Sequence, residues 1–151
     1  MSRASLLATA LALTACGPSY QLTLPEQFVQ LQEGRGTYQM RATTTDGVVV
    51  GLDVIPNREH ASPTFWVDAA RRAVRDGQGY ALLGEDAIDA ASGQHGQILR
   101  FGRDLNGHAY RYTIVLFVTP DAIWLIEAGG REAAYTAVES EIEASIRAMR
   151  F

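Results

Sequence analysis

Hydrophobic residues along the chain follow two spacings, one typical of strands and one typical of helices. Six segments are rich in β-branched, aromatic and aliphatic residues, as strands are, and they span residues 38–45, 48–55, 80–90, 97–105, 108–118 and 123–128. Asp46-Gly47 and Asn106-Gly107 each separate two of these segments, and such dipeptides favour tight hairpin turns. Strands joined by two-residue turns run antiparallel, so we expect an antiparallel sheet.

Two other segments carry the spacing of an amphipathic helix. In residues 62–77, Ser62 and Pro63 are typical of a helix start, an apolar stripe follows, and Gly77 marks the end. In residues 131–149, apolar residues recur every three or four positions: Tyr135, Val138, Ile142, Ile146 and Met149. The pair Gly129-Gly130 precedes this helix and is expected to end the last strand.

Residues 115–118 are apolar at successive positions, so we expect their strand to be buried on both sides. A helix packed on each face of the sheet would provide that cover. The sequence therefore predicts an α+β fold, in which a curved antiparallel sheet of about five or six strands has one helix on each face.

The first fifteen residues have the polarity of a secretory signal peptide. Arg3 gives a positive start, and residues 4–15 carry no charge but are too few to cross ~30 Å of hydrocarbon as a helix. Cys16, the one cysteine in the chain, follows Leu13-Thr14-Ala15, and this tetrapeptide resembles the lipobox of bacterial lipoproteins. We expect cleavage before Cys16 and lipid attachment to its sulfur. The alternative is a plain cleaved signal peptide with a chance cysteine.

This interpretation divides the chain into three parts: a signal peptide at 1–15, a lipidated cysteine with a short linker at 16–33, and one domain at 34–151. Acyl chains on Cys16 would hold the protein on the bacterial cell envelope. Gly17, in place of aspartate, favours the outer membrane over the inner membrane, with the domain facing the periplasm. Apolar linker residues, among them Leu22, Leu24 and Phe28, are expected to dock on the domain.

Charge and motifs argue against several classes of function. The net charge of −4 becomes −5 once Arg3 leaves with the signal peptide, and nucleic-acid phosphates require a basic surface, so we expect no nucleic-acid partner. His60, His95 and His108 are far apart in the sequence, and we expect neither a metal site nor a cofactor. The sequence holds no Gly-x-Ser-x-Gly elbow and no phosphate-binding loop, so we do not expect an enzyme.

Two groups of residues remain as candidates for a site. Glu127 follows apolar residues in its strand, and Arg111 on the preceding strand is predicted to form a structural ion pair with it, because buried carboxylates need a partner. Six aromatic residues are candidates for a groove between helix and sheet, although a place in the core is the simpler interpretation: Phe65, Trp66, Tyr80, Tyr110, Tyr112 and Trp124.

Several residues at particular places in this order of elements also point to a known fold. They are Leu24-Pro25, Phe28, Asp46-Gly47, Phe65-Trp66, Gly79-Tyr80, Gly107, Tyr110, Tyr112 and Ile126-Glu127-Ala128. With them the chain resembles the PsbP-like fold, which also includes a nuclear Ran-binding import factor and the bacterial envelope lipoprotein family typified by DcrB. The resemblance covers roughly residues 24–150. It implies a binding or accessory role beside a membrane, with no inherited active site.

We therefore expect a lipid-anchored envelope lipoprotein that acts as a non-catalytic protein-binding or accessory module, attached to the membrane through Cys16 and bound to an envelope protein. The alternative is a small-ligand or metal-binding lipoprotein with an aromatic-lined pocket. A closed apolar cavity with converging polar groups favours the alternative. A packed interior with an exposed apolar patch favours a protein partner.

Overall fold

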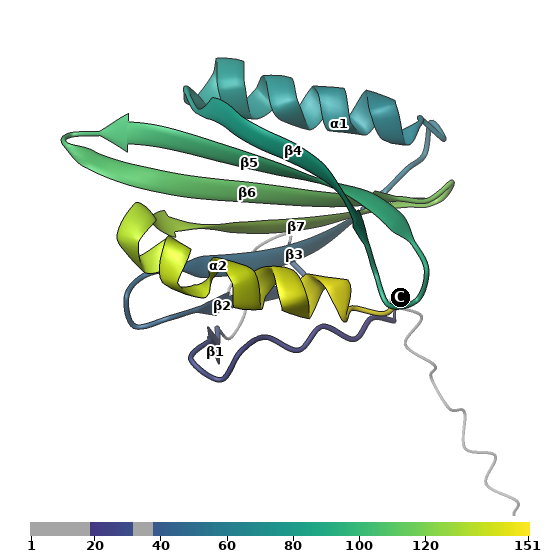
Figure 1. The fold of residues 1–151 in the computed structure, drawn as a ribbon. Coiled ribbons are helices and arrows are strands. Elements are labelled where there is room, and N and C mark those ends of the chain that lie inside the picture. The colour runs from purple at the N-terminus through teal and green to yellow at the C-terminus, as the bar shows by residue number, and fades with distance from the viewer. Residues whose placement is uncertain (1–18, 32–37) are drawn as a thin grey trace, which may run out of the picture.

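The computed structural model describes residues 19–31 and 38–151 (Figure 1). The elements in chain order are β1 (Val29–Gln30), β2 (Met40–Thr43), β3 (Val49–Pro56), α1 (Pro63–Arg72), a π-helical turn (Ala73–Gly77), β4 (Ala81–Asp89), β5 (His95–Leu105), β6 (His108–Val118), β7 (Ala122–Arg131) and α2 (Glu132–Arg147). The predicted signal peptide and Cys16 lie outside the described residues.

The described strands form one seven-stranded sheet in the order β1-β2-β3-β7-β6-β5-β4. Every neighbouring pair in it is antiparallel, which confirms the α+β class and the antiparallel sheet. The predicted count of five or six strands is wrong, because Val29 and Gln30 pair with the edge of β2 as an additional strand. A strand of two residues is too short to leave an alternating pattern in the sequence.

Hydrophobic residues form two clusters, and successive residues of β6 belong to different ones. Val115 and Phe117 join a cluster with Tyr135, Ile142 and Ile146 of α2. Ile114 and Leu116 join a second cluster with Val67 of α1 and Val74 of the π-helical turn. Neighbouring side chains of a strand point to opposite sides, so the two clusters lie on opposite faces of the sheet. We call these faces the α2 face and the α1 face.

The Asn106-Gly107 turn and the first helix cap follow the sequence signals. Asp46-Gly47 does not form the expected two-residue turn, because β2 and β3 last pair at Thr43 and Val49 and the Gly47 amide donates to the Thr44 carbonyl within a longer loop. Asn106 and Gly107, between β5 and β6, have φ angles of 52° and 79°, as a two-residue hairpin turn requires. The Ser62 side chain accepts a hydrogen bond from the amide of Phe65, and Pro63 opens α1.

The prediction that Gly129-Gly130 ends the last strand is wrong, because β7 continues through both glycines to Arg131. Gly129 is paired with Val49 of β3 and with Tyr112 of β6. A Cβ atom at Gly129 would lie 3.1 Å from the Arg111 carbonyl oxygen, so the absence of a side chain permits a close approach of the strands there. α2 begins directly after Arg131.

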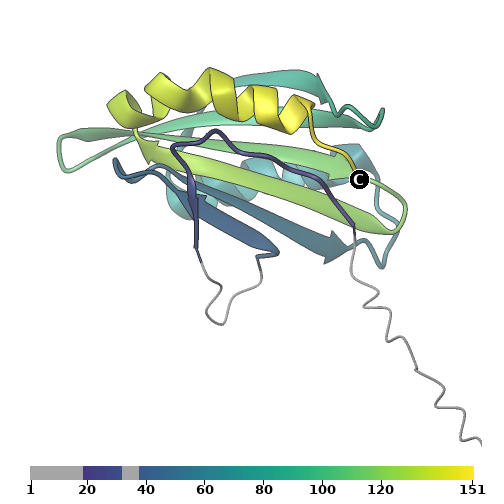
Figure 2. The ribbon, with the colours of Figure 1, turned by 90° about the horizontal axis from the view of Figure 1, so that it is seen from below.

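The two ends of the sheet hold different parts of the chain, as Figures 1 and 2 show. At one end, Gln21 and Arg150 exchange backbone hydrogen bonds of 2.9 and 3.1 Å, so the first described residues lie beside the C-terminus. The amide of Phe151 also donates to Ser92 in the β4–β5 turn. We call this the terminal end. The opposite end, with the Asn106-Gly107 turn and the start of α2, is the hairpin end.

The segment predicted as a linker packs on the domain as far as the structure describes it. Leu22, Leu24 and Phe28 contact the cluster on the α2 face, as expected. The Gln27 side chain also donates a 2.6 Å hydrogen bond to Glu141 of α2. Residues 19–31 therefore belong to the packed unit.

Candidate functional site

Glu127 and Arg111 are not brought together. Glu127 lies opposite Ile114 and Arg111 lies opposite Gly130 in the register of β6 and β7, so their side chains point to opposite faces of the sheet. Arg111 instead forms an ion pair with Glu132 at the start of α2. The predicted Arg111–Glu127 pair is wrong.

Glu127 accepts hydrogen bonds from two tyrosines on the α1 face. The Tyr38 hydroxyl donates to one carboxylate oxygen at 2.7 Å, and the Tyr112 hydroxyl donates to the other. The Tyr38 ring lies over Gly51, where a Cβ atom would come within 2.8 Å of the ring. The carboxylate thus has neutral donors, which satisfy it as an ion pair would have done.

This arrangement changes the acidity of both phenols. The hydrogen bond to Glu127, with partial burial, raises the pKa of Tyr38 to about 12. Burial, and then the same carboxylate, raise the pKa of Tyr112 well above its usual range. Each hydroxyl is held in its protonated form because a phenolate would face the negative charge of Glu127.

The six candidate aromatic residues do not line one groove. Phe65 and Trp66 pack edge to face at the start of α1, with ring centroids 5.3 Å apart. Tyr80 and Tyr112 contact each other at 5.6 Å on the α1 face. Trp124 belongs to the cluster on the opposite face.

Tyr110, the sixth aromatic candidate, lines a hollow of about 470 Å³ toward the hairpin end. Leu83, Gly102, Arg111 and Glu132 also line it. A second hollow, of about 380 Å³, shares Leu83 and Arg111 with the first and continues along α2. We call the two together the β4–α2 groove.

Leu83 is the apolar centre of the groove, with 52% of its surface exposed. The register of β4 and β5 shifts between Leu82 and Gly84, and this bulge places Leu83 outside the regular pairing. Gly102 makes room for it, since a Cβ atom there would lie 2.8 Å from Leu83 Cδ1. The glycine that follows Leu83 in the sequence was the available signal for the bulge.

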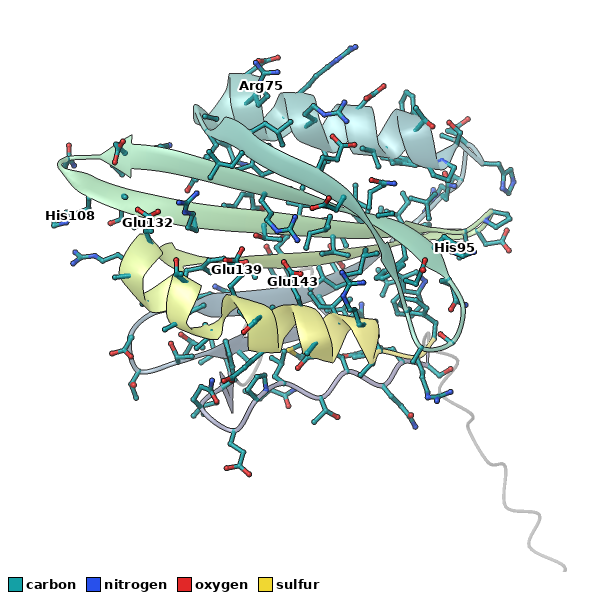
Figure 3. All side chains as sticks on the ribbon, in the orientation of Figure 1. Arg75, His95, His108, Glu132, Glu139 and Glu143 are labelled. Carbon is teal, nitrogen blue, oxygen red and sulfur yellow. The ribbon has the colours of Figure 1, made fainter. Side chains whose placement is uncertain are left out.

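Ion pairs line the groove and hold its walls. Arg100 on β5 donates to Asp86 of the edge strand β4 at 2.6 Å and to Glu143 of α2 at 2.7 Å. Figure 3 shows Glu132, Glu139 and Glu143 spaced along α2. The guanidinium therefore links the edge of the sheet to the helix, a role that sequence reasoning missed because α2 is distant in the chain from β4 and β5.

No group of three histidine, cysteine, aspartate or glutamate side chains within residues 19–31 and 38–151 is arranged to hold a metal ion. Figure 3 places His95 at the terminal end and His108 at the hairpin end. His95 contacts Asp89 at 2.6 Å.

Within residues 19–31 and 38–151, no helix has the length and hydropathy needed to span a bilayer.

Known proteins match this chain in their structures and not in their sequences. No protein-family model matches the sequence, and no curated protein sequence matches it. Among solved structures, LpqN, described as involved in cell envelope biogenesis of Mycobacterium tuberculosis, has a TM-score of 0.70 at 14% identity, over 91% of this chain and 85% of LpqN. The cyanobacterial PsbP protein of Synechocystis sp. PCC 6803 has a TM-score of 0.62 at 12% identity, over 87% and 85% of the two chains.

The chain has the PsbP-like fold. The Ran-binding protein Mog1p of Saccharomyces cerevisiae has the same fold, with a TM-score of 0.62 at 10% identity over 87% of this chain and 89% of Mog1p. This confirms the predicted fold resemblance. Identities this low establish shared architecture only, and the resemblance to the DcrB family stays a prediction.

Proposed function

We propose that this protein is a lipid-anchored lipoprotein of the cell envelope and that its domain binds another envelope protein without catalysing a reaction. The tetrapeptide Leu13-Thr14-Ala15-Cys16 behind a signal-like segment supports the anchor. Gly17 favours the outer membrane and a domain that faces the periplasm. The envelope role described for LpqN, and the Ran binding of Mog1p, are consistent with an accessory module of this fold.

The β4–α2 groove is the feature of the structure that best supports the proposed binding function. A half-exposed leucine lies in it, with the Arg111–Glu132 pair beside it and the Arg100 ion pairs further along. An apolar anchor within a polar rim is the usual anatomy of a protein interface. We assign the groove to an envelope protein that places an apolar side chain against Leu83.

Two other uses of this surface are less well supported. A small-ligand site is usually enclosed and mainly apolar, whereas this groove is open and is lined by charged side chains, of which Arg100 pairs with Glu139 and Arg111 with Glu132. Strand addition at the free edge of β4 is opposed by the bulge at Leu83 and by the acidic side chains Glu85, Asp86 and Asp89.

Site-specific photo-crosslinking in intact cells tests the proposal. A crosslinker at position 83, and one at Thr136 on the α2 side of the groove, should capture the same envelope protein. A crosslinker at Val29, which is 63% exposed on β1, serves as the matched control and should not capture it. When the crosslinking is repeated on isolated envelopes, added purified domain should reduce formation of the adduct, and the Leu83→Asp domain should not.

Equal capture at positions 29 and 83 would contradict the proposal. So would different products from positions 83 and 136, because one partner in the groove must contact both walls.

A further inference from the structure

Phe65 is an aromatic residue that is exposed to solvent in the folded domain. It is 57% exposed at the start of α1, although a phenylalanine ring carries a large apolar area. Among the described residues, its one ring contact is with Trp66, at 5.3 Å and nearly perpendicular. Pro63 and Pro120 beside this helix start are exposed as well.

The loop and the Trp66 side chain beneath Phe65 are fixed by hydrogen bonds to one buried residue, Asn57. The buried Asn57 side chain donates to the carbonyls of Ala61 and Thr119, both at 3.0 Å. Its oxygen accepts from the Trp66 indole at 3.1 Å and from the amide of Ala61 at 3.0 Å. With all its hydrogen-bonding groups used, Asn57 fixes the loop, the β6–β7 turn and Trp66 together, and Phe65 is held outward on that base.

This base belongs to the terminal end of the sheet. The backbone N–H of Asn57 donates to the backbone carbonyl of Asp121 in the β6–β7 turn at 2.9 Å, and His60 contacts the Pro120 carbonyl at 2.7 Å. β5 starts at the same end, since Gly96 pairs with Phe117 just before that turn. Figure 1 shows the start of α1 and the first described residues at one end of the molecule.

The length of chain before residue 19 limits how far this end is from the proposed anchor. Three residue steps separate Cys16 from Ser19, and a fully extended chain covers at most ~3.6 Å per residue, which gives a reach of about 11 Å. Exposed charges at this end are of both signs, with Arg58 near Glu59 and Asp121. An apolar contact therefore fits this surface better than an attraction to anionic lipid.

We propose that the terminal end rests on the bilayer that holds Cys16 and that the Phe65 ring inserts among the lipids. This inference depends on the proposed lipid anchor. It orients the domain with its strands rising from the membrane. β5 has eleven residues, and its ten steps of ~3.3 Å separate the two ends by about 33 Å, so the hairpin end of the β4–α2 groove faces away from the lipid.

Quenching of tryptophan fluorescence by brominated lipid tests the orientation. The lipoprotein is reconstituted in phosphatidylcholine and phosphatidylglycerol vesicles with brominated acyl chains, as two variants, Phe65→Trp and Leu105→Trp. Leu105 is the matched control because it is apolar, 41% exposed and at the hairpin end. The native Trp66 and Trp124 are common to both variants.

The quenching of the wild-type protein, which comes from Trp66 and Trp124, is subtracted from that of each variant. We expect the remaining quenching of Phe65→Trp to be roughly threefold or more stronger than that of Leu105→Trp, because interfacial side chains enter the headgroup and acyl boundary. Equal quenching, or stronger quenching at position 105, would overturn the proposal.

The same experiment separates this inference from the anchor itself. If cells do not lipidate the protein, a chain that starts at Cys16 keeps every residue the structure describes, and its one thiol can be coupled to a maleimide phospholipid. Strong quenching of Phe65→Trp after coupling would then support the membrane-facing surface while the cellular anchor is rejected. If the coupled Phe65→Trp and Leu105→Trp variants were quenched equally, the inference about the membrane-facing surface would be overturned, whatever the cellular anchor is.

Discussion

At the terminal end of the sheet, aromatic rings from distant parts of the chain pack on one another, whereas at the hairpin end charged side chains pair across an open groove. Trp124 contacts Tyr20 at 6.1 Å and Phe151 at 4.6 Å, which joins both ends of the described chain to β7. At the other end, Arg111 and Glu132 pair beside the exposed Leu83.

The packing at the terminal end suits firm attachment, and the open groove toward the hairpin end suits recognition of a partner. Apolar packing at the terminal end resists displacement of the segment that leads to Cys16, as an anchored domain needs. Ion pairs around an open groove give little stability but define a surface that a partner can distinguish. On the proposed function, one end of the same sheet serves attachment and the other serves binding.

The largest effect is expected from Trp124→Ala, which removes the ring that joins Tyr20 and Phe151. We expect the free energy of unfolding to fall by about 3–5 kcal/mol, since truncation of a buried aromatic residue leaves a cavity. Denaturant-induced unfolding of the purified domain measures it. Leu105→Ala at the hairpin end is the control and should change the free energy by no more than about 0.5 kcal/mol. Similar losses at both positions would remove the contrast between the ends.

Glu127→Gln should lower the free energy of unfolding by about 1.5–3 kcal/mol, the range for hydrogen bonds to a charged group. In the amide one of the two oxygens becomes an NH2 donor, so one of Tyr38 and Tyr112 loses the acceptor for its hydroxyl proton. Glu59→Gln, on an exposed loop, is the matched control. Equal melting temperatures for the two variants would show that the carboxylate contributes nothing.

Gly107→Ala tests the hairpin turn and should cost about 1–2 kcal/mol, because φ is 79° there and L-residues avoid that region. Gly77→Ala is the control, since that glycine has open space around its Cα and a negative φ. Thermal unfolding of both variants provides the comparison. A loss at Gly107 as large as that at Trp124 would mean that the hairpin end limits stability.

The last effect is confined to alkaline pH. The pKa of Tyr38 and that of Tyr135 are each raised from 10.0 to about 12, the first mainly by Glu127 and the second by burial. Each hydroxyl holds its proton more tightly in the folded chain, so its contribution to stability is complete below pH 10 and is lost as the pH rises toward 12.

Absorbance of tyrosinate during a pH titration measures this loss. In Glu127→Gln the pKa of Tyr38 should return toward 10, while Tyr135, which donates to Thr113 beneath α2, should titrate as before. An unchanged titration in Glu127→Gln would contradict the role given to the carboxylate.

The fold was largely predictable because its signals are local. Ser62-Pro63 and Asn106-Gly107 specify a helix start and a turn within a few residues of chain. The Arg111–Glu127 pair failed because it depends on register across the β6–β7 turn. A shift of one residue in register exchanges the faces of a whole strand, and no local pattern specifies that shift.

The candidate site was less predictable for a related reason. Spacing identifies which residues are apolar, but it does not show that Trp124 packs on the α2 face while Tyr112 packs on the other. The groove depends on a bulge at Leu83 and on Arg100, which joins the β4–β5 hairpin to α2, an element distant in sequence. Such features arise from tertiary packing.

Metabolic labelling with palmitate is the most direct test of the account, because attachment through Cys16 underlies both the proposed function and the orientation of the two ends. Wild-type protein should carry the label and sediment with membranes, and Cys16→Ser should lose the label and leave the membrane fraction. An unlabelled wild-type protein, or a Cys16→Ser variant that is retained on membranes as firmly as the wild type, would contradict it.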